Sequence, residues 1–217
     1  MEDEYREERE RMVALLRRRG ISKEVLEAMN RVKRHLFVPP ELRDQAYGDY
    51  PLPIGGGQTI SAPHMVAMMC DYLKLERGDK VLEIGAGSGY HAAVIAELIG
   101  AEGRVYTVER LALLVDFSTR NLREAGYKNV VVVSGDGTLG LPEYAPFNKI
   151  CVTCAAPAVP PPLLEQLETG GRMVIPIGRY IQELYLVEKK KNGIVKQSKC
   201  EVVFVPLIGR FGFKEVR

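Results

Sequence analysis

The sequence predicts an α/β fold in which helices cover both faces of a doubly wound, mostly parallel sheet. The first observation is a regular alternation of short apolar runs and helical patterns that begins at Gly78. The second is a glycine-rich turn, Gly85 to Gly89, between a buried strand and a helix. The third is a change of pattern after Gly178, which predicts antiparallel strands joined by a basic turn. Helices before the sheet complete the expected architecture.

The glycine-rich turn is the most informative stretch for function. Val81 to Ile84 predict a buried strand, and His91 to Ile99 predict the helix that follows the turn. Glycines allow positive φ angles and let a ligand approach the main chain, and free amides of the first helical turn face that ligand. The spacing is G-x-G-x-G, so the third glycine comes one residue earlier than in the dinucleotide pattern.

Acidic residues end or follow the next predicted strands. Glu109 closes the strand that starts at Arg104, about 20 residues after the turn, where an acid suits a ribose diol. Ribose recognition without a pyrophosphate motif favours a nucleoside-type ligand such as S-adenosylmethionine. Asp136, between two glycines, either accepts a hydrogen bond from an adenine amino group or holds a turn, and the sequence leaves both readings open.

The rest of the sheet region follows the same alternation. We expect strands at 80–84, 104–109, 130–134, 149–153 and 171–176, and helices at 91–99, 111–125 and 161–167. Antiparallel strands are expected at 181–189 and 194–205. Because such sheets bind ligands beyond the carboxyl ends of their strands, the glycine turn, Glu109 and Asp136 are expected at one rim. The apolar tail, 205–213, is expected to fold back over that rim.

The start of the chain predicts helices and loops without visible chemistry. Residues 3–19 have an amphipathic helical pattern, and Ser22 is a suitable N-cap for a second helix. Two prolines at the end of the segment 34–40 predict extended chain there. The segment 47–53 is expected to be a loop.

A second glycine-rich segment precedes the sheet region. Three consecutive glycines at 55–57 predict a sharp bend or contact with a ligand. Ser61 is followed by Ala62 and Pro63, a pattern typical of the N-cap of a helix over about residues 64–73. From these residues alone, Ser61 is expected to cap that helix.

Composition narrows the class of protein. The chain has 217 residues, 46% hydrophobic and 27% charged, with a formal net charge of +2, which fits one soluble domain. This charge gives no argument for a nucleic acid or membrane partner. The four cysteines suggest no disulfide framework, so a reducing cytoplasm is expected. Cys151 and Cys154 fall on opposite faces of a predicted strand, so no metal or redox site is expected.

Several stretches together resemble the protein-L-isoaspartate (D-aspartate) O-methyltransferase family. The matching stretches are RHLFVPP at 34–40, IGGGQTISAPHM at 54–65, VLEIGAGSGY at 81–90, VER at 108–110, GDG at 135–137, GGRMVIPIG at 170–178 and VPL at 205–207. They occur in family order and span nearly the whole chain. The VLEIGAGSGY stretch is similar to that of many S-adenosylmethionine enzymes, whereas the GGQTIS segment is far more specific.

The resemblance implies a single domain with a Rossmann-like methyltransferase fold. Its expected parts are N-terminal helices and a substrate and cofactor loop (1–60), a cofactor-binding core (61–178) and antiparallel strands with a tail (179–217). It also implies that S-adenosyl-L-methionine donates a methyl group to the α-carboxylate of L-isoaspartyl residues, with D-aspartyl residues as a further class. The ester then collapses to a succinimide outside the enzyme. The expected partners are damaged proteins and peptides, and a monomer is expected.

Roles for individual residues also follow from the resemblance. It assigns catalysis to Ser61 and substrate contacts to Thr59, Ser61 and Ile208. The cofactor-binding residues that it implies are Gln58, Thr59, Ile60, Gly85, Ala86, Gly87, Ser88, Gly89, Glu109, Arg110, Asp136 and Gly137. The glycine turn would bind the amino-acid end of the cofactor, Glu109 its ribose, and Asp136 with Gly137 its adenine region.

The expected chemistry agrees with these residue types. An α-carboxylate has an unperturbed pKa of about 4, so it is already ionised at neutral pH and needs no strong base. We therefore expect Ser61 to orient the carboxylate rather than to remove a proton. The alternatives are another methyltransferase on the same fold, a non-catalytic nucleotide-binding module and a dehydrogenase. The 54–61 loop disfavours the first, the intact set of site residues the second, and the glycine spacing the third.

Overall fold

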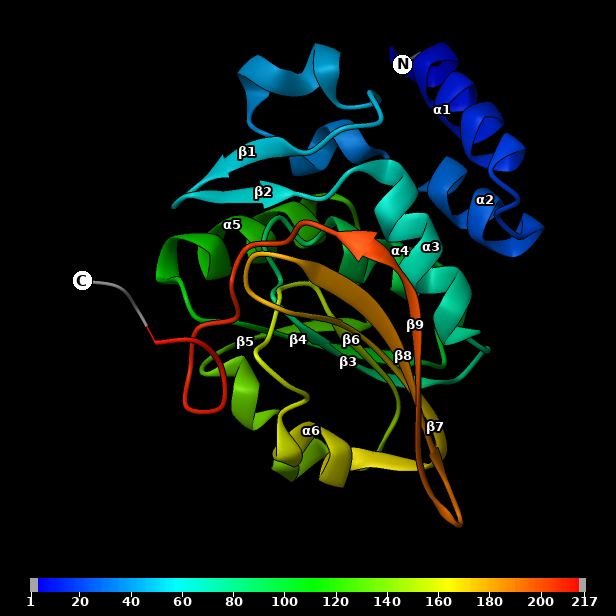
Figure 1. Ribbon diagram of the computed structural model, residues 1–217. Helices are drawn as coiled ribbons and strands as arrows, with labels where there is room; N and C mark the ends of the chain where they lie inside the picture. Colours follow the sequence, from blue (N-terminus) through cyan, green and yellow to red (C-terminus); the bar gives the residue numbers. More distant parts are fainter. Residues whose placement is uncertain (1–3, 215–217) are drawn as a thin grey trace.

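The computed structural model describes residues 4–214 and contains a seven-stranded sheet with helices on both faces (Figure 1). The strand order is β5-β4-β3-β6-β7-β8-β9. The strands are β3 (Lys80–Ile84), β4 (Arg104–Glu109), β5 (Val130–Ser134), β6 (Phe147–Val152), β7 (Leu167–Ile177), β8 (Gln182–Lys190) and β9 (Gly193–Val202). The predicted doubly wound, mostly parallel fold is confirmed.

The parallel strands align their carboxyl ends at one edge of the sheet. β3 lies between β4 and β6, with Val81 opposite Val105 on one side and Lys149 on the other. β7 runs parallel to β6, whereas β8 and β9 are antiparallel to their neighbours. The first three strands have the bounds that the sequence predicts, and β6 and β7 begin earlier than predicted.

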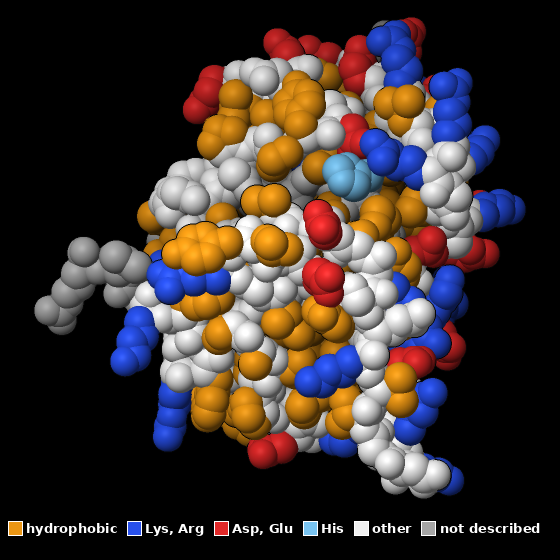
Figure 2. All heavy atoms as spheres, viewed as in Figure 1, with side chains coloured by type: hydrophobic (Ala, Val, Ile, Leu, Met, Phe, Trp, Pro, Cys, Tyr) orange, Lys and Arg blue, Asp and Glu red, His pale blue; other side chains and the backbone are white. Residues whose placement is uncertain are grey.

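Most helices cover one face of the sheet. These are α3 (Pro63–Leu73), α4 (Tyr90–Ile99) and α5 (Ala112–Glu124), with the N-terminal α1 (Arg6–Arg18) and α2 (Lys23–Arg31) packed outside them. α6 (Pro161–Gln166) lies on the opposite face (Figure 1). The predicted first helix is confirmed over 6–18, whereas residue 3 lies outside the described residues. None of the helices within 4–214 has the length and apolarity that a membrane crossing requires. Acidic and basic side chains are scattered among hydrophobic ones over the face shown in Figure 2.

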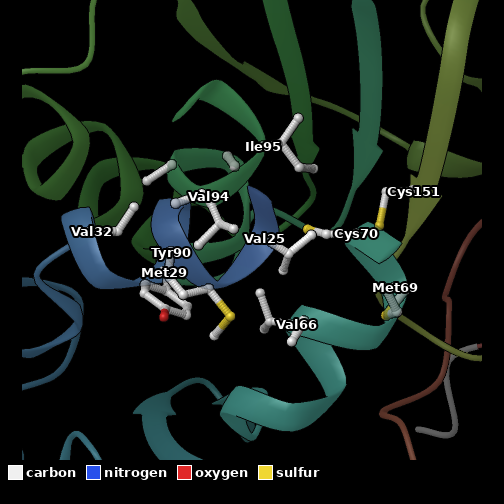
Figure 3. Close-up of a cluster of buried hydrophobic side chains, with 14 of the residues drawn as sticks. Val25, Met29, Val32, Val66, Met69, Cys70, Tyr90, Val94, Ile95 and Cys151 are labelled. Atoms are coloured by element: carbon white, nitrogen blue, oxygen red, sulfur yellow. The ribbon is translucent and has the colours of Figure 1, made fainter. Parts of the chain in front are cut away.

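A cluster of buried apolar side chains joins the N-terminal helices to the core. Val25 and Met29 of α2 meet Val66 of α3 and Val94 of α4 in the interior (Figure 3). The aromatic ring of Tyr90, at the start of α4, belongs to the same cluster. The N-terminal helices therefore help to fix the helix that follows the glycine turn.

The expectation of extended chain over 34–40 is wrong. Short 3-10 helices occupy Arg34–Phe37 (η1) and Pro40–Gln45 (η2). Proline restricts the residue before it, and the two residues that precede prolines, Val38 (φ −121°, ψ 157°) and Pro39 (φ −53°, ψ 144°), are extended between these helices. Pro40 sits in the first turn of η2, where a missing amide costs no hydrogen bond.

The predicted loop over 47–53 is wrong at its end. Leu52 begins β1 (Leu52–Gly55), which pairs in an antiparallel hairpin with β2 (Gln58–Ile60). Gly55, Gly56 and Gly57 have φ angles of 92°, 59° and 71°, so the glycine run does make the sharp bend that the sequence predicts. The strands β1 and β2 are too short for the sequence to show the two-residue alternation that identifies a strand.

The last strands and the tail cover the edge of the sheet. β8 and β9 form the predicted hairpin, with Lys190 paired to Gly193 across the turn. Residues 205–213, here called the C-terminal strap, leave this hairpin and cross the sheet edge toward the β5 side (Figure 1, red). Ala155 donates its amide to Val205, and Leu207 donates its amide to Ala155, which anchors the start of the strap.

Candidate functional site

A pocket opens where β3, β4 and β6 end. Its empty volume is about 830 Å³, including space open to solvent, which suits a small-molecule ligand. The glycine turn and Glu109 line its sheet side, whereas the hairpin residues 58–61 and strap residues 205–208 line its other side. The pocket therefore lies beyond the carboxyl ends of the strands, where such sheets bind ligands.

The glycine turn has the backbone conformation that its residues predict. Gly85, Gly87 and Gly89 have φ angles of 96°, 54° and 86°. A Cβ on Gly85 would lie 2.5 Å from Oγ1 of Thr153, so no larger residue fits there. Thr153 lies just after β6 and donates its hydroxyl toward the carbonyls of Ile84 and Gly85.

Glu109 binds the main chain around the turn. Its Oε2 accepts from the amide of Gly87 at 3.0 Å, and its Oε1 accepts from the amides of Arg110 and Leu111 at 2.9 and 3.0 Å. The side chain is buried yet lines the pocket. Glu109 thus fixes the glycine turn as well as presenting a carboxylate to a ligand.

A side chain that the sequence analysis missed supports the same turn from α5. Asn121 is buried and donates its Nδ2 to the carbonyl of Ser88 at 2.9 Å. Gly89 is the N-cap of α4 rather than a lining residue, and a Cβ there would lie 3.0 Å from Leu122. The polar residue on the inner face of a predicted amphipathic helix was the available signal for Asn121.

The expectation that Ser61 caps α3 is wrong. The N-cap of α3 is Ala62, and no side chain within the helix end provides the cap. Asp49 does so instead, because its Oδ1 accepts from the amide of His64 at 2.9 Å and contacts Nδ1 of His64 at 2.8 Å. Ser61 is therefore free of a capping role, is partly exposed and lines the pocket.

The carboxylate of Asp49 is further held by an ion pair. Arg19 of the α1–α2 turn lies 2.9 Å from Oδ2. Partial burial alone would raise the pKa of Asp49, but the hydrogen bonds from His64 and the charge of Arg19 outweigh it and lower that pKa. Asp49 thus remains a charged cap at neutral pH.

Asp136 turns toward the strap rather than into the pocket. Its Oδ1 accepts from the amide of Thr138 at 2.9 Å, and its Oδ2 accepts from the amide of Arg210 at 2.8 Å. The neighbouring Gly137 lines the pocket, whereas Asp136 does not. The structure thus shows that Asp136 holds a turn, and a contact of this turn with adenine stays a prediction.

A buried polar cluster underlies the glycine turn. Thr107 donates to Oε2 of Glu83, and Oε1 of Glu83 lies 3.8 Å from Nδ1 of His91. Sγ of Cys70 lies 3.3 Å from Nε2 of His91. Burial raises the pKa of Glu83 to about 8 and lowers the pKa of His91 to about 4. Burial also raises the pKa of the Cys151 thiol, so these groups are neutral near pH 7.

Most of the predicted site residues meet in this one pocket. Those that line it are Gln58, Thr59, Ile60, Ser61, Gly85, Ala86, Gly87, Ser88, Glu109, Arg110, Gly137 and Ile208. Lining residues that the sequence analysis missed include Thr153, Cys154 and Leu111. Within residues 4–214, no group of His, Cys, Asp or Glu side chains is arranged to hold a metal ion.

The doubly wound sheet, the glycine turn and the acid at the end of the adjacent strand define the nucleoside-binding α/β class to which S-adenosylmethionine-dependent methyltransferases belong. Comparison with protein families agrees with this class. The family model "Protein-L-isoaspartate(D-aspartate) O-methyltransferase" matches residues 7–212. The chain therefore belongs to the protein-L-isoaspartate (D-aspartate) O-methyltransferase family.

Individual relatives agree with this membership. The chain is 58% identical over 207 residues to the protein-L-isoaspartate O-methyltransferase of Methanothrix thermoacetophila, covering 95% of this chain and 98% of the relative. It is 56% identical over 218 residues to that of Methanopyrus kandleri, covering 97% and 96% of the two chains.

Solved structures share the fold over nearly the whole chain. One protein-L-isoaspartate O-methyltransferase matches with a TM-score of 0.87 and 32% identity, covering 94% of this chain and 67% of the other. A Plasmodium falciparum protein assigned to the same activity, crystallised with S-adenosyl-L-homocysteine, matches with a TM-score of 0.83 and 31% identity. Here the match covers 92% of this chain and 98% of the other.

Proposed function

We propose that this protein transfers the methyl group of S-adenosyl-L-methionine to the α-carboxylate of L-isoaspartyl residues in damaged proteins and peptides, which initiates their repair through a succinimide. The observation that carries the proposal is the junction of two segments in one pocket. The glycine turn and the hairpin residues Gln58 to Ser61 line it together, in a chain that belongs to the isoaspartate methyltransferase family. D-aspartyl residues, which the family description also names, are a second substrate class.

The sheet side of the pocket suits the cofactor. The positive-φ glycines let a ligand reach the main chain from Gly85 to Gly89, and the Glu109 carboxylate suits a ribose diol. We assign further cofactor contacts to Gln58, Thr59, Ile60, Arg110 and the Asp136–Gly137 turn. When bound, S-adenosyl-L-methionine supplies an electrophilic methyl group on a sulfonium, which leaves as a neutral thioether.

The other side of the pocket suits the substrate. Thr59, Ser61 and Ile208 are assigned to substrate contacts, and all three line the pocket. Only an extended, exposed peptide can reach between the hairpin and the strap, so flexible segments are the expected substrates. The shape of this side must accept the extra backbone methylene of isoaspartate and reject normal aspartate.

Ser61 orients the attacking carboxylate in this account. The substrate carboxylate, with an ordinary pKa of about 4, is ionised and needs no general base. A neutral hydroxyl can hold the carboxylate in line with less loss of nucleophilicity than a cation would cause, so most of the rate gain comes from positioning. The availability of the Ser61 hydroxyl, because Asp49 caps α3, supports this role.

We further propose that the protein acts as a monomer in a reducing cytoplasm, without a nucleic acid or membrane partner. The monomer follows the expectation from the sequence. Four free cysteines and a formal net charge of +2 support the remaining points.

The test is methyl transfer from labelled S-adenosyl-L-methionine to paired peptides that differ only in aspartate or isoaspartate. We expect base-labile labelling of the isoaspartyl peptide alone. Equal labelling of both peptides would contradict the proposed selectivity. If the protein binds S-adenosyl-L-homocysteine but labels neither peptide, the proposed cofactor would stand and the proposed substrate would be wrong.

A further inference from the structure

The C-terminal strap is a closed loop with a defined internal geometry. The amide of Phe213 donates to the carbonyl of Leu207 at 2.7 Å, and the amide of Gly212 donates to the carbonyl of Gly209 at 3.1 Å. A β-bridge also pairs Ile208 with Phe213. These bonds shape the strap from within, but they do not attach it to the sheet.

One face of the strap forms a wall of the pocket. Residues 205–208 line the pocket together with the glycine turn and Ser61. Leu207 is almost fully buried, which fixes this part of the strap against the core. Residues 205–208 of the strap therefore supply part of the pocket wall.

Asp136 attaches the strap to the end of β5. Its Oδ2 accepts from the amide of Arg210 at 2.8 Å, across 74 residues of sequence. Its Oδ1 accepts from both the amide and the hydroxyl of Thr138, at 2.9 and 2.7 Å. Both carboxylate oxygens are thus engaged, one within the turn and one with the strap.

Thr138 makes the second attachment. Its hydroxyl donates to Asp136 and accepts from the amide of Phe211 at 3.1 Å. The side chain is fully buried, so water does not compete for these bonds. Asp136 therefore holds the amide of Arg210, and Thr138, which is hydrogen-bonded to Asp136, holds the amide of Phe211.

Gly209 permits this close approach. A Cβ at Gly209 would collide with Oδ1 of Asp136, and the nearest other atoms also belong to the Asp136 carboxylate. The strap backbone thus rests directly on the carboxylate, and only glycine fits at this contact.

We infer that Asp136 and Thr138 are positioning residues that clamp the C-terminal strap over the substrate side of the pocket. This inference rests on the proposed function, because it assigns the strap to isoaspartyl peptide binding. Both act through the strap, and Gly137 between them lines the pocket. The Asp136–Thr138 turn therefore joins the cofactor side of the site to its substrate side.

The charge of Asp136 is suited to this task. Partial burial alone would raise the pKa of Asp136, but the amides of Arg210 and Thr138 and the Thr138 hydroxyl lower it below its ordinary value. The ionised carboxylate is the better acceptor for strap amides. Apart from the Thr138 hydroxyl, the donors to this carboxylate are main-chain amides, whose dipoles stabilise its negative charge.

The test uses Thr138→Val, which keeps the side-chain shape and removes the hydroxyl, and Gly209→Ala, which forces the strap away from Asp136. Each variant should raise the KM for an isoaspartyl peptide about fivefold to tenfold, as the loss of one or two hydrogen bonds predicts. The dissociation constant of S-adenosyl-L-homocysteine and the kcat should stay within about twofold. Thr119→Val, on the exposed face of α5, is the matched control.

An unchanged KM in both variants would overturn the inference. So would a weaker S-adenosyl-L-homocysteine affinity in proportion to the KM, since Thr138 and Gly209 would then act on the cofactor rather than through the strap on the peptide. Hydrogen exchange of the amides of Arg210 and Phe211 gives a readout that needs no activity, and Thr138→Val should speed it without changing exchange at 85–89. If the wild type methylates no isoaspartyl peptide, the proposed function fails, and this exchange measurement still decides whether the clamp exists.

Discussion

The two sides of the pocket are built in different ways. The cofactor side centres on a strand, a turn and a helix in direct succession, and Glu109, Asn121 and Thr153 from later elements hydrogen-bond to this turn. The substrate side combines a hairpin near residue 55 with a strap near residue 208, and it is held by contacts such as Asp136 to Arg210, 74 residues apart.

This difference sets what each side can tolerate. On the cofactor side, glycine conformations and a buried core leave little room for movement. On the substrate side, a few hydrogen bonds between partly exposed segments fix the geometry. We therefore expect changes on the cofactor side to alter cofactor affinity or stability strongly, and changes on the substrate side to alter peptide binding moderately.

The largest expected effect concerns the core beneath the cofactor side. Burial raises the pKa of Glu83 to about 8, from an ordinary value near 4.5. Between these values the folded state keeps a proton that the unfolded state has released, so stability falls as the pH rises through this window. Relative to Glu83→Gln, the wild type should lose about 3 to 4 kcal/mol of unfolding free energy between pH 5 and pH 9.

Urea unfolding of both proteins at pH 5, 7 and 9 measures this difference. Burial lowers the pKa of His91 to about 4, so His91 destabilises both proteins as the pH falls below about 6.5. Because this effect is common to both proteins, it cancels when their unfolding free energies are compared. Parallel pH dependence of the two proteins would show that Glu83 does not hold a proton in the folded state.

The next effect concerns the glycine turn itself. Gly85→Ala would place a Cβ 2.5 Å from Oγ1 of Thr153 at a φ angle of 96°. Steric strain of about 2 to 3 kcal/mol should weaken S-adenosyl-L-homocysteine binding by about 30- to 150-fold in calorimetry. Gly126→Ala is the matched control, because Gly126 has a φ angle of 85° but open space around it. Equal losses in both variants would show that backbone strain alone, not the turn, is responsible.

The smallest effect concerns the cap of α3 on the substrate side. Asp49→Ala removes the acceptor for the His64 amide, which should destabilise the protein by about 1 kcal/mol and raise the peptide KM a few-fold. The cofactor affinity should not change, as calorimetry can check. Arg19→Ala removes the partly exposed ion pair but keeps the cap, so it should be nearly neutral. If Asp49→Ala and the wild type have a similar peptide KM, the cap of α3 does not contribute to peptide binding.

The same contrast explains what the sequence could predict. The strands 80–84, 104–109 and 130–134, the glycine turn and Glu109 obey local rules of periodicity and turn chemistry, and all are found as expected. Gly89, which was expected among the cofactor-binding residues, is the N-cap of α4 and is absent from the pocket lining, and its contact with the cofactor stays a prediction.

The substrate side depends on contacts that no local pattern reveals. Ser61 has the local signature of an N-cap, yet Asp49, from a segment expected to be a loop, takes that role. Asp136 was expected near adenine or in a turn, and its partner Arg210 belongs to a tail that was expected only to fold back over the sheet rim. Family resemblance, rather than periodicity, was what brought Thr59, Ser61 and Ile208 together.

The most direct test of the account is the single-turnover methyl transfer rate of Ser61→Ala, with saturating cofactor and isoaspartyl peptide. Because the Ser61 hydroxyl is free to orient the carboxylate, its loss should slow transfer about 10- to 100-fold, as expected for a hydrogen bond to a charged group. The dissociation constant of S-adenosyl-L-homocysteine should stay within about twofold of wild type. An unchanged transfer rate would contradict the orienting role and, with it, the assignment of the hairpin side to the substrate.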